Sequence, residues 1–306
     1  MRLASRAAPS TTSTPPTDRT SRDTHPFRDL TTVTPSGTGA DGRYSAHIDS
    51  IWTIGPKVHG GCMMAVCAAA ARRELTATAP SDMPVDPAVQ SLAVSANYLA
   101  APDPGDVDIV ATVRKRGRQV SLVDVELSQN GRPAVHAAVT LGVPDAGSRT
   151  TRRSRRSRNC PPSRPPRRTR SSPTIRWRRS CTSRRAAICG STARRRTSSA
   201  AGRANPRSGC GRGPWADDEQ DPATAALFAI MTGDICAPVT MNRGIFGWAP
   251  TVQLTTYLRR RPAPGWLRVM ASSTVLGDTW FEEDHTVLDS TGAVVVQSRQ
   301  LAMIPR

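Results

Sequence analysis

The sequence predicts an α+β protein made of two similar halves, each with a buried helix followed by a meander of antiparallel strands. Two observations predict this fold class. A nearly all-apolar helical segment precedes four strand-like segments twice along the chain, and the two strand series can be aligned with each other. The chain of 306 residues is long enough for two domains of ordinary size.

In the first half, residues 42–49 (GRYSAHID) alternate between apolar and polar side chains, as in a half-buried strand. Residues 55–75 (GPKVHGGCMMAVCAAAARREL) begin with a glycine-containing turn and continue as an apolar helix with basic residues near its C-terminus. Strand-like segments follow at 89–99, 106–116, 119–129 and 133–142. Asn130-Gly131 predicts a tight hairpin turn between the last two.

The second half repeats this order. Residues 221–238 (DPATAALFAIMTGDICAP) predict a helix with Asp221 at its N-cap and Pro222 in its first turn. Strand-like segments follow at 250–261, 266–276, 278–289 and 293–304.

The two strand series align with Tyr98 on Tyr257 and Gly131 on Gly292, at offsets of 159 and 161 residues. We therefore expect an internal duplication. A long apolar helix wrapped by a curved antiparallel sheet is the hotdog architecture. Two such halves can pair their sheets edge to edge and so cover strand edges that would otherwise be exposed. The sequence thus predicts a double hotdog.

The segment from residue 148 to residue 215 differs from the rest of the chain. It contains 21 Arg residues and no Asp, Glu or Lys, and subtracting these 21 charges from the formal net charge of +18 leaves −3 for the remainder. It also holds four of the seven cysteines, at spacings that match no zinc-binding pattern. Outside it, the composition is that of an ordinary, slightly acidic protein.

Three interpretations of this segment remain open. A genuine Arg/Ser/Pro arm would be disordered and would bind phosphates by charge, and a linker would be disordered without a partner. We favour a reading-frame error in a GC-rich gene, because codons chosen for 175–184 (IRWRRSCTSR) can be regrouped to encode a peptide of ordinary composition. Nucleic acid is then not a partner. The first strand of the second half, expected near 208–215 (SGCGRGPW), is then missing.

The predicted organisation is a disordered tail at 1–24, a first hotdog at 25–147, the Arg-rich segment at 148–215 and a second hotdog at 216–306. The tail lacks the apolar core of a secretory signal. No run of 18 apolar residues occurs, so no membrane span is expected. Three cysteines outside the Arg-rich segment are expected to be buried free thiols in a reducing cytoplasm: Cys62, Cys67 and Cys236.

Three stretches resemble the acyl-CoA thioesterase family of the thioesterase II type, which has a double hotdog fold. They are 55–71 (GPKVHGGCMMAVCAAAA), 246–267 (FGWAPTVQLTTYLRRRPAPGWL) and 280–306 (WFEEDHTVLDSTGAVVVQSRQLAMIPR). The resemblance implies that an Asp, a Thr or Ser, and a Gln hold and activate a water molecule at the thioester. The matching residues are Asp234, Thr251 and Gln300.

These residue types suit that chemistry. A carboxylate can orient or deprotonate water, and a hydroxyl and an amide can complete its hydrogen bonds or donate to the developing oxyanion. Each also has a structural alternative: Asp234 could cap a helix break, Thr251 could begin a strand, and Gln300 could be an exposed strand residue. For Asp234, the cost of burying a carboxylate in an apolar helix favours a function.

Five further residues are predicted to contact the substrate: His59, Gly60, Gly61, Trp248 and Tyr257. The glycines would let the backbone approach a ligand or a helix start. His59 could instead be structural, and the aromatic residues could belong to the core. The segment 281–285 (FEEDH) alternates between the two faces of a strand, so neither a metal site nor a cofactor is expected.

The sequence therefore predicts a cytoplasmic enzyme of fatty acid metabolism that hydrolyses acyl-CoA to a free acid and CoA by direct attack of water. Hotdog sheets also offer a surface for a homo-oligomer. Two alternatives remain. One is a non-catalytic acyl-CoA-binding hotdog protein, favoured if Asp234 points away from the pocket. The other is a basic nucleic-acid-binding protein, which rests wholly on the Arg-rich segment.

Overall fold

The computed structural model describes residues 25–37, 41–147, 188–190, 207–213, 218 and 220–305. The predicted tail at 1–24 and most of the Arg-rich segment lie outside the described residues. The helices are α1 (Pro26–Thr31), α2 (Gly60–Ala77) and α3 (Pro222–Met231), with the 3-10 turns η1 (Ser50–Trp52), η6 (Thr232–Asp234) and η7 (Val239–Arg243).

The described strands of the first half are β1 (Thr34–Pro35), β2 (Arg43–Ile48), β3 (Thr53–Ile54), β4 (Lys57–Val58), β5 (Gln90–Tyr98), β6 (Gly105–Lys115), β7 (Val120–Gln129) and β8 (Arg132–Gly142). Those that follow are β9 (Ile188–Gly190), β10 (Arg207–Gly213), β11 (Thr251–Leu258), β12 (Leu267–Ser272), β13 (Trp280–Leu288) and β14 (Val294–Met303). The segments predicted as strands on either side of the Arg-rich segment all contain one.

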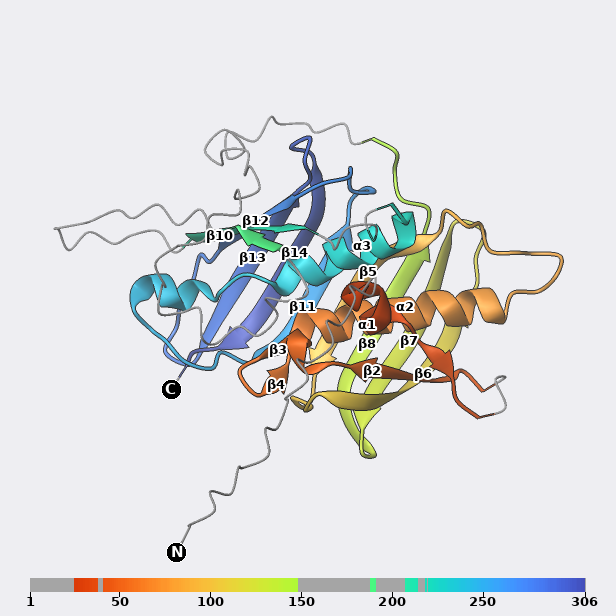
Figure 1. Cartoon of the computed structure of the whole chain (residues 1–306), viewed down its shortest axis with the longest axis horizontal. Helices are drawn as coiled ribbons and strands as arrows, with labels where there is room; N and C mark the ends of the chain where they lie inside the picture. The colour runs from red at the N-terminus through yellow and green to blue at the C-terminus, as the bar shows by residue number, and fades with distance from the viewer. Residues whose placement is uncertain are drawn as a thin grey trace, which may run out of the picture.

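Twelve of these strands form one large sheet, in the order β1-β2-β6-β7-β8-β5-β11-β14-β13-β12-β10-β9. The pairing order β2-β6-β7-β8-β5 of the first half is matched by β10-β12-β13-β14-β11 in the second. The halves join where β5 pairs antiparallel with β11, which covers the edge that each half would otherwise expose. The fold is the predicted α+β double hotdog (Figure 1).

The expectation that the second half lacks its first strand is wrong. Strand β10 pairs antiparallel with β12, from Arg207 opposite Ser272 to Arg212 opposite Leu267. It occupies the place beside β12 that β2 occupies beside β6. Strand pairing uses backbone N–H and C=O groups, so a segment rich in Gly and Arg can complete the sheet whatever its side chains.

Helices α2 and α3 lie side by side on one face of the large sheet (Figure 1). Helix α2 also packs against α1 and against strands β5 to β8. Being enclosed on most sides, it can be apolar around nearly its whole circumference. Its only buried charged residue is Glu74, near its C-terminal end.

Helix α3 begins as predicted and ends earlier. The Asp221 carboxylate accepts the backbone N–H groups of Ala223 and Thr224, at 3.3 and 3.0 Å, which makes it the N-cap. The helix ends at Met231 rather than continuing to Pro238. Gly233 weakens helix formation and Pro238 cannot donate a backbone hydrogen bond. The chain instead continues as the 3-10 turn η6, so Asp234 lies after the end of α3 rather than within it.

One described segment is long and apolar enough to cross a membrane. Residues Pro222–Arg243 have a mean hydropathy of 1.4 in their most apolar window, and 61% of that window is buried inside the fold. Since α3 packs between α2 and the sheet, its place in the core accounts for this hydropathy. That membranes are not a partner stays a prediction.

We expect the mutation Tyr44→Phe to destabilise the first half. The Tyr44 hydroxyl donates to Glu74 Oε2 at 2.6 Å, and both side chains are buried. The phenylalanine variant leaves the buried Glu74 Oε2 without this hydrogen bond. We expect the free energy of unfolding to fall by about 1–3 kcal/mol. Urea denaturation measures the change. Tyr257→Phe is the control, because the Tyr257 ring is exposed; equal midpoints for the two variants would contradict the expectation.

Candidate active site

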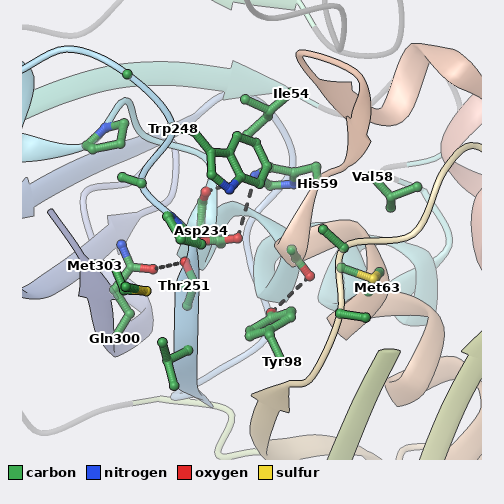
Figure 2. A pocket seen from close by; sticks show the side chains of 18 of the residues that line it. Ile54, Val58, His59, Met63, Tyr98, Asp234, Trp248, Thr251, Gln300 and Met303 are labelled. Atoms are coloured by element: carbon green, nitrogen blue, oxygen red, sulfur yellow. Dashed lines mark hydrogen bonds and ion pairs between the residues drawn. The ribbon is translucent and has the colours of Figure 1, made fainter. Parts of the chain in front are cut away.

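A cavity of about 340 Å³ opens where the N-terminus of α2 meets η6 and the start of β11. Asp234, Thr251 and Gln300, which are far apart in the sequence, all line it. Figure 2 shows the three side chains around the same space. Much of the remaining lining is apolar, including Val58 and Met63. The structure therefore brings the three predicted catalytic residues together.

Asp234 is held at the boundary between the two halves. Its side chain is only 10% exposed, and the backbone N–H of Gly61 donates to it. Burial raises the pKa of Asp234 above its ordinary value, although the nearby His59 and the Gly61 N–H oppose the shift. The carboxylate is therefore a stronger base than an exposed aspartate, and it points into the cavity rather than away from it (Figure 2).

His59 supports the main chain at Asp234. Its Nε2 lies 2.9 Å from the Asp234 backbone oxygen and 3.7 Å from the carboxylate Oδ2. Since a carbonyl oxygen only accepts, Nε2 carries the proton, and Nδ1 faces the Cys62 thiol at 3.5 Å. His59 lines the cavity, but both ring nitrogens already have partners. These two contacts favour a structural role for His59, which holds the main chain at Asp234, over a role as a catalytic base.

Gly60 and Gly61 allow the start of α2 to approach η6 closely. A Cβ on Gly60 would lie 2.6 Å from Asp234 Oδ2 and 3.3 Å from the Tyr98 ring. A Cβ on Gly61 would lie 2.5 Å from the Met231 backbone oxygen. Gly60 lines the cavity, whereas Gly61 is not among its lining residues. Both glycines therefore allow a close approach of the backbone, as predicted. At Gly61 the neighbours are Asp234 and the end of α3.

Thr251 reaches the cavity because β11 is irregular at its start. The register between β11 and β14 shifts between Thr251 and Gln253, where two residues of β11 oppose one of β14. Such a bulge redirects a side chain that regular alternation would send to the other face. The Thr251 hydroxyl donates to Gln300 Oε1 at 2.8 Å.

Gln300 lies on the inner face of β14 and is only 6% exposed. The alternative of an exposed strand residue is therefore wrong. Its neighbours in sequence, Arg299 and Leu301, face outward, as the alternation of a strand requires.

The two aromatic candidates differ. Trp248 lines the cavity and remains 47% exposed. Tyr257 is not among the residues that line it, so its contact with substrate stays a prediction that this cavity does not support. Strand alternation explains the difference: Leu254, Thr256 and Leu258 face the core, so Tyr257 faces the opposite side and is 46% exposed.

The sequence did not reveal two polar residues at the site. The Tyr98 hydroxyl donates to the Gly60 backbone oxygen at 3.0 Å, and its ring lines the cavity. Glu283 is fully buried, and its Oε2 accepts an amide N–H of Gln300 at 3.0 Å. The period-2 pattern of 281–285 contained the signal, since Phe281, Glu283 and His285 share the inner face of β13.

The three cysteines outside the Arg-rich segment are free thiols, and of these Cys62 and Cys67 are buried as expected. Cys236 is half-buried and lines the cavity. Burial raises the pKa of Cys67 to about 12. Within the described part of the chain, no group of three or more His, Cys, Asp or Glu side chains could hold a metal ion.

Comparison with known proteins identifies the family of the chain. Residues 48–142 match the profile of the acyl-CoA thioesterase N-terminal domain, and residues 133–304 match that of the C-terminal domain. An uncharacterized protein of Mycobacterium tuberculosis is 41% identical over 288 residues, which covers 86% of this chain and 91% of the relative.

Solved structures show the same architecture. A protein of Thermobifida fusca assigned to thioesterase II superposes with a TM-score of 0.69 and 26% identity, over 92% of this chain and 97% of that one. A hotdog protein of Alicyclobacillus acidocaldarius superposes with a TM-score of 0.67 at 17% identity, over 92% of this chain and 99% of that one. The second likeness concerns the fold alone. Together with the two domain matches, these findings show that the chain belongs to the acyl-CoA thioesterase family and has the double hotdog fold of the thioesterase II type.

Proposed function

We propose that the protein hydrolyses acyl-CoA thioesters by direct attack of a water molecule held between Asp234 and Thr251. One observation carries the proposal: a buried carboxylate and a hydroxyl oxygen line the same largely apolar cavity. Because the Thr251 hydroxyl donates its O–H to Gln300 Oε1, its oxygen lone pairs remain free to accept a hydrogen bond. Two acceptors can hold the two hydrogens of one water molecule and direct its lone pair toward a carbonyl carbon.

The proposed steps conserve atoms and charge. The water oxygen bonds to the thioester carbonyl carbon while one water proton passes to Asp234. The tetrahedral intermediate then breaks its C–S bond, and the proton moves from Asp234 to the departing CoA sulfur. The Gln300 amide has a second N–H beyond the one bound to Glu283, and this N–H is a donor for the developing oxyanion. The raised pKa of Asp234 suits proton acceptance and return.

The apolar lining supports a fatty acyl group as the substrate's acyl part. Val58, Met63, Met241 and Met303 offer flexible or branched apolar surface around the polar end of the cavity. We further propose that the protein acts in fatty acid metabolism in the cytoplasm. Its partner would be acyl-CoA, and it would bind neither nucleic acid nor a membrane. Copies of the chain would associate through the outer faces of the sheet.

Hydrolysis and simple acyl-CoA binding are separated by one experiment. Purified protein is incubated with saturated acyl-CoA of several chain lengths, while free thiol is followed with a colorimetric reagent and binding is measured by calorimetry. We expect CoA release in excess of the protein concentration. Tight binding with no release would instead support a non-catalytic acyl-CoA-binding protein, although Asp234 points into the cavity.

A further inference from the structure

Glu283 lies behind the cavity and takes no part in the steps described above. It is fully buried on the inner face of β13 and is not among the cavity's lining residues. It sits directly opposite Gln300 in the β13–β14 pairing. Burying a carboxyl group is costly unless it has a partner, and here the partner is a residue of the proposed active site.

The hydrogen bonds form a chain with a fixed direction. Glu283 Oε2 accepts from Gln300 Nε2 at 3.0 Å, and Gln300 Oε1 accepts from the Thr251 hydroxyl at 2.8 Å. A side-chain amide has one donating end and one accepting end. An acceptor behind Gln300 therefore turns the amide oxygen of Gln300 toward Thr251, and this oxygen accepts the hydrogen bond that the Thr251 hydroxyl donates.

We propose that Glu283 is a positioning residue that fixes the amide orientation of Gln300 and, through it, makes the Thr251 oxygen an acceptor toward the reacting water. This inference rests on the proposed function. Without the Glu283 oxygen, the amide can rotate by half a turn and present an N–H to Thr251. The threonine hydroxyl would then donate into the cavity and compete with the water's own hydrogens.

The surroundings of Glu283 indicate whether its neutral or its ionised carboxyl group accepts the hydrogen bond from Gln300. Burial raises its pKa to about 8, although hydrogen bonds from Gln300 and the Val239 N–H oppose the shift; the charges of Asp234 and Glu282 add to it. Glu283 Oε1 has no hydrogen-bond partner among the described residues. It lies 3.7 Å from Nε2 of His285.

His285, on the same strand, is also neutral, since burial lowers its pKa to about 4. At pH 7 both groups are therefore uncharged. The carbonyl oxygen of the neutral acid then accepts from Gln300, and its O–H lies on the side facing His285. A glutamine at position 283 would reproduce this arrangement with its own carbonyl oxygen and NH₂ group.

Two variants test the inference through the pH dependence of CoA release. Glu283→Gln should keep a kcat at pH 7 comparable to wild type. As pH rises through about 8, Glu283 ionises in the wild type and places a negative charge behind the oxyanion, so its rate should fall; the glutamine variant should show no such fall. Glu283→Met removes the acceptor and should lower kcat roughly 10- to 100-fold, the range seen for supporting partners of metal ligands, with little change in KM.

Asp284→Asn is the matched control. It changes the adjacent carboxylate, which faces the outer side of β13 and pairs with Arg299 at 2.7 Å, so kcat and the pH profile should match wild type. A wild-type kcat in Glu283→Met, or an unchanged alkaline fall in Glu283→Gln, would overturn the inference.

A measurement without catalysis separates this inference from the proposed function. The side-chain amide signals of Gln300 in an NMR spectrum are identified by their loss in Gln300→Leu. They should shift with a midpoint near pH 8 in the wild type and not in Glu283→Gln. Signals that do not titrate in a protein that releases CoA would refute the role of Glu283 alone. Titrating signals in a protein that releases no CoA would refute the proposed function and leave the hydrogen-bond order intact.

Discussion

Asp234→Asn is expected to lower kcat for CoA release by about 10²- to 10⁴-fold, the contribution that a general base makes to a reaction. Asparagine has nearly the same shape, and its side-chain oxygen can still accept the Gly61 N–H that now reaches the carboxylate. It cannot take a proton from water. The substitution therefore removes the base and keeps the cavity, and KM should change little.

The same variant should also be at least as stable as the wild type. Burial raises the pKa of Asp234, so the folded state disfavours the charged form. The folded protein then holds its proton to higher pH than the unfolded chain does, and stability falls as pH rises from the ordinary pKa through the raised one. The asparagine side chain has no charge to bury. Thermal unfolding at neutral pH should show an equal or higher midpoint.

Asp124→Asn is the control for both effects. This carboxylate lies on β7, away from the cavity, and pairs with Arg114 at 2.7 Å. An exposed ion pair contributes little to stability, so its kcat and midpoint should match wild type. Wild-type turnover in Asp234→Asn would remove Asp234 from the mechanism.

Gly61→Ala is expected to damage both stability and activity. The added Cβ would lie 2.5 Å from the Met231 backbone oxygen and 3.1 Å from the Asp234 Cβ, so α2 and η6 must move apart. In a helix with free space, alanine would stabilise by up to about 1 kcal/mol over glycine. Here the overpacking should instead cost about 1–3 kcal/mol.

The displacement also moves Asp234, since the Gly61 N–H holds its carboxylate. A shift of about 1 Å at a reacting group can lower the rate by about 10²-fold. Gly147→Ala is the control, because its Cβ would meet no atom within 4 Å. Urea denaturation and CoA release measure the two effects. A Gly61→Ala variant as stable and active as Gly147→Ala would show that the two halves do not need this close contact.

The elements that could be predicted from the sequence are those whose burial leaves a periodic pattern. Helix α2 is apolar on nearly every face because it is enclosed on most sides, and the strands on either side alternate because one face of the sheet meets the helices. Asp234, Thr251 and Gln300 could be named as candidates only through the resemblance to the thioesterase family, because their spacing in the sequence does not indicate that they lie together.

What the sequence could not show depends on contacts between distant segments. The bulge at Thr251–Gln253 is a mismatch with β14 and leaves no local signal. The burial of Glu283 could be inferred from alternation, but its partner Gln300 could not, because their distance follows from strand register. β10 was missed because its pairing uses the backbone, which side-chain patterns do not report.

The most direct test of the account is a crystal structure of Asp234→Asn with a bound acyl-CoA. We expect the thioester carbonyl carbon in the 340 Å³ cavity, with room for one water molecule between it, the substituted side chain at position 234 and the side chain of Thr251. The acyl chain should lie against the apolar lining beside Met63. A thioester bound elsewhere on the protein, out of reach of residue 234, would contradict the account.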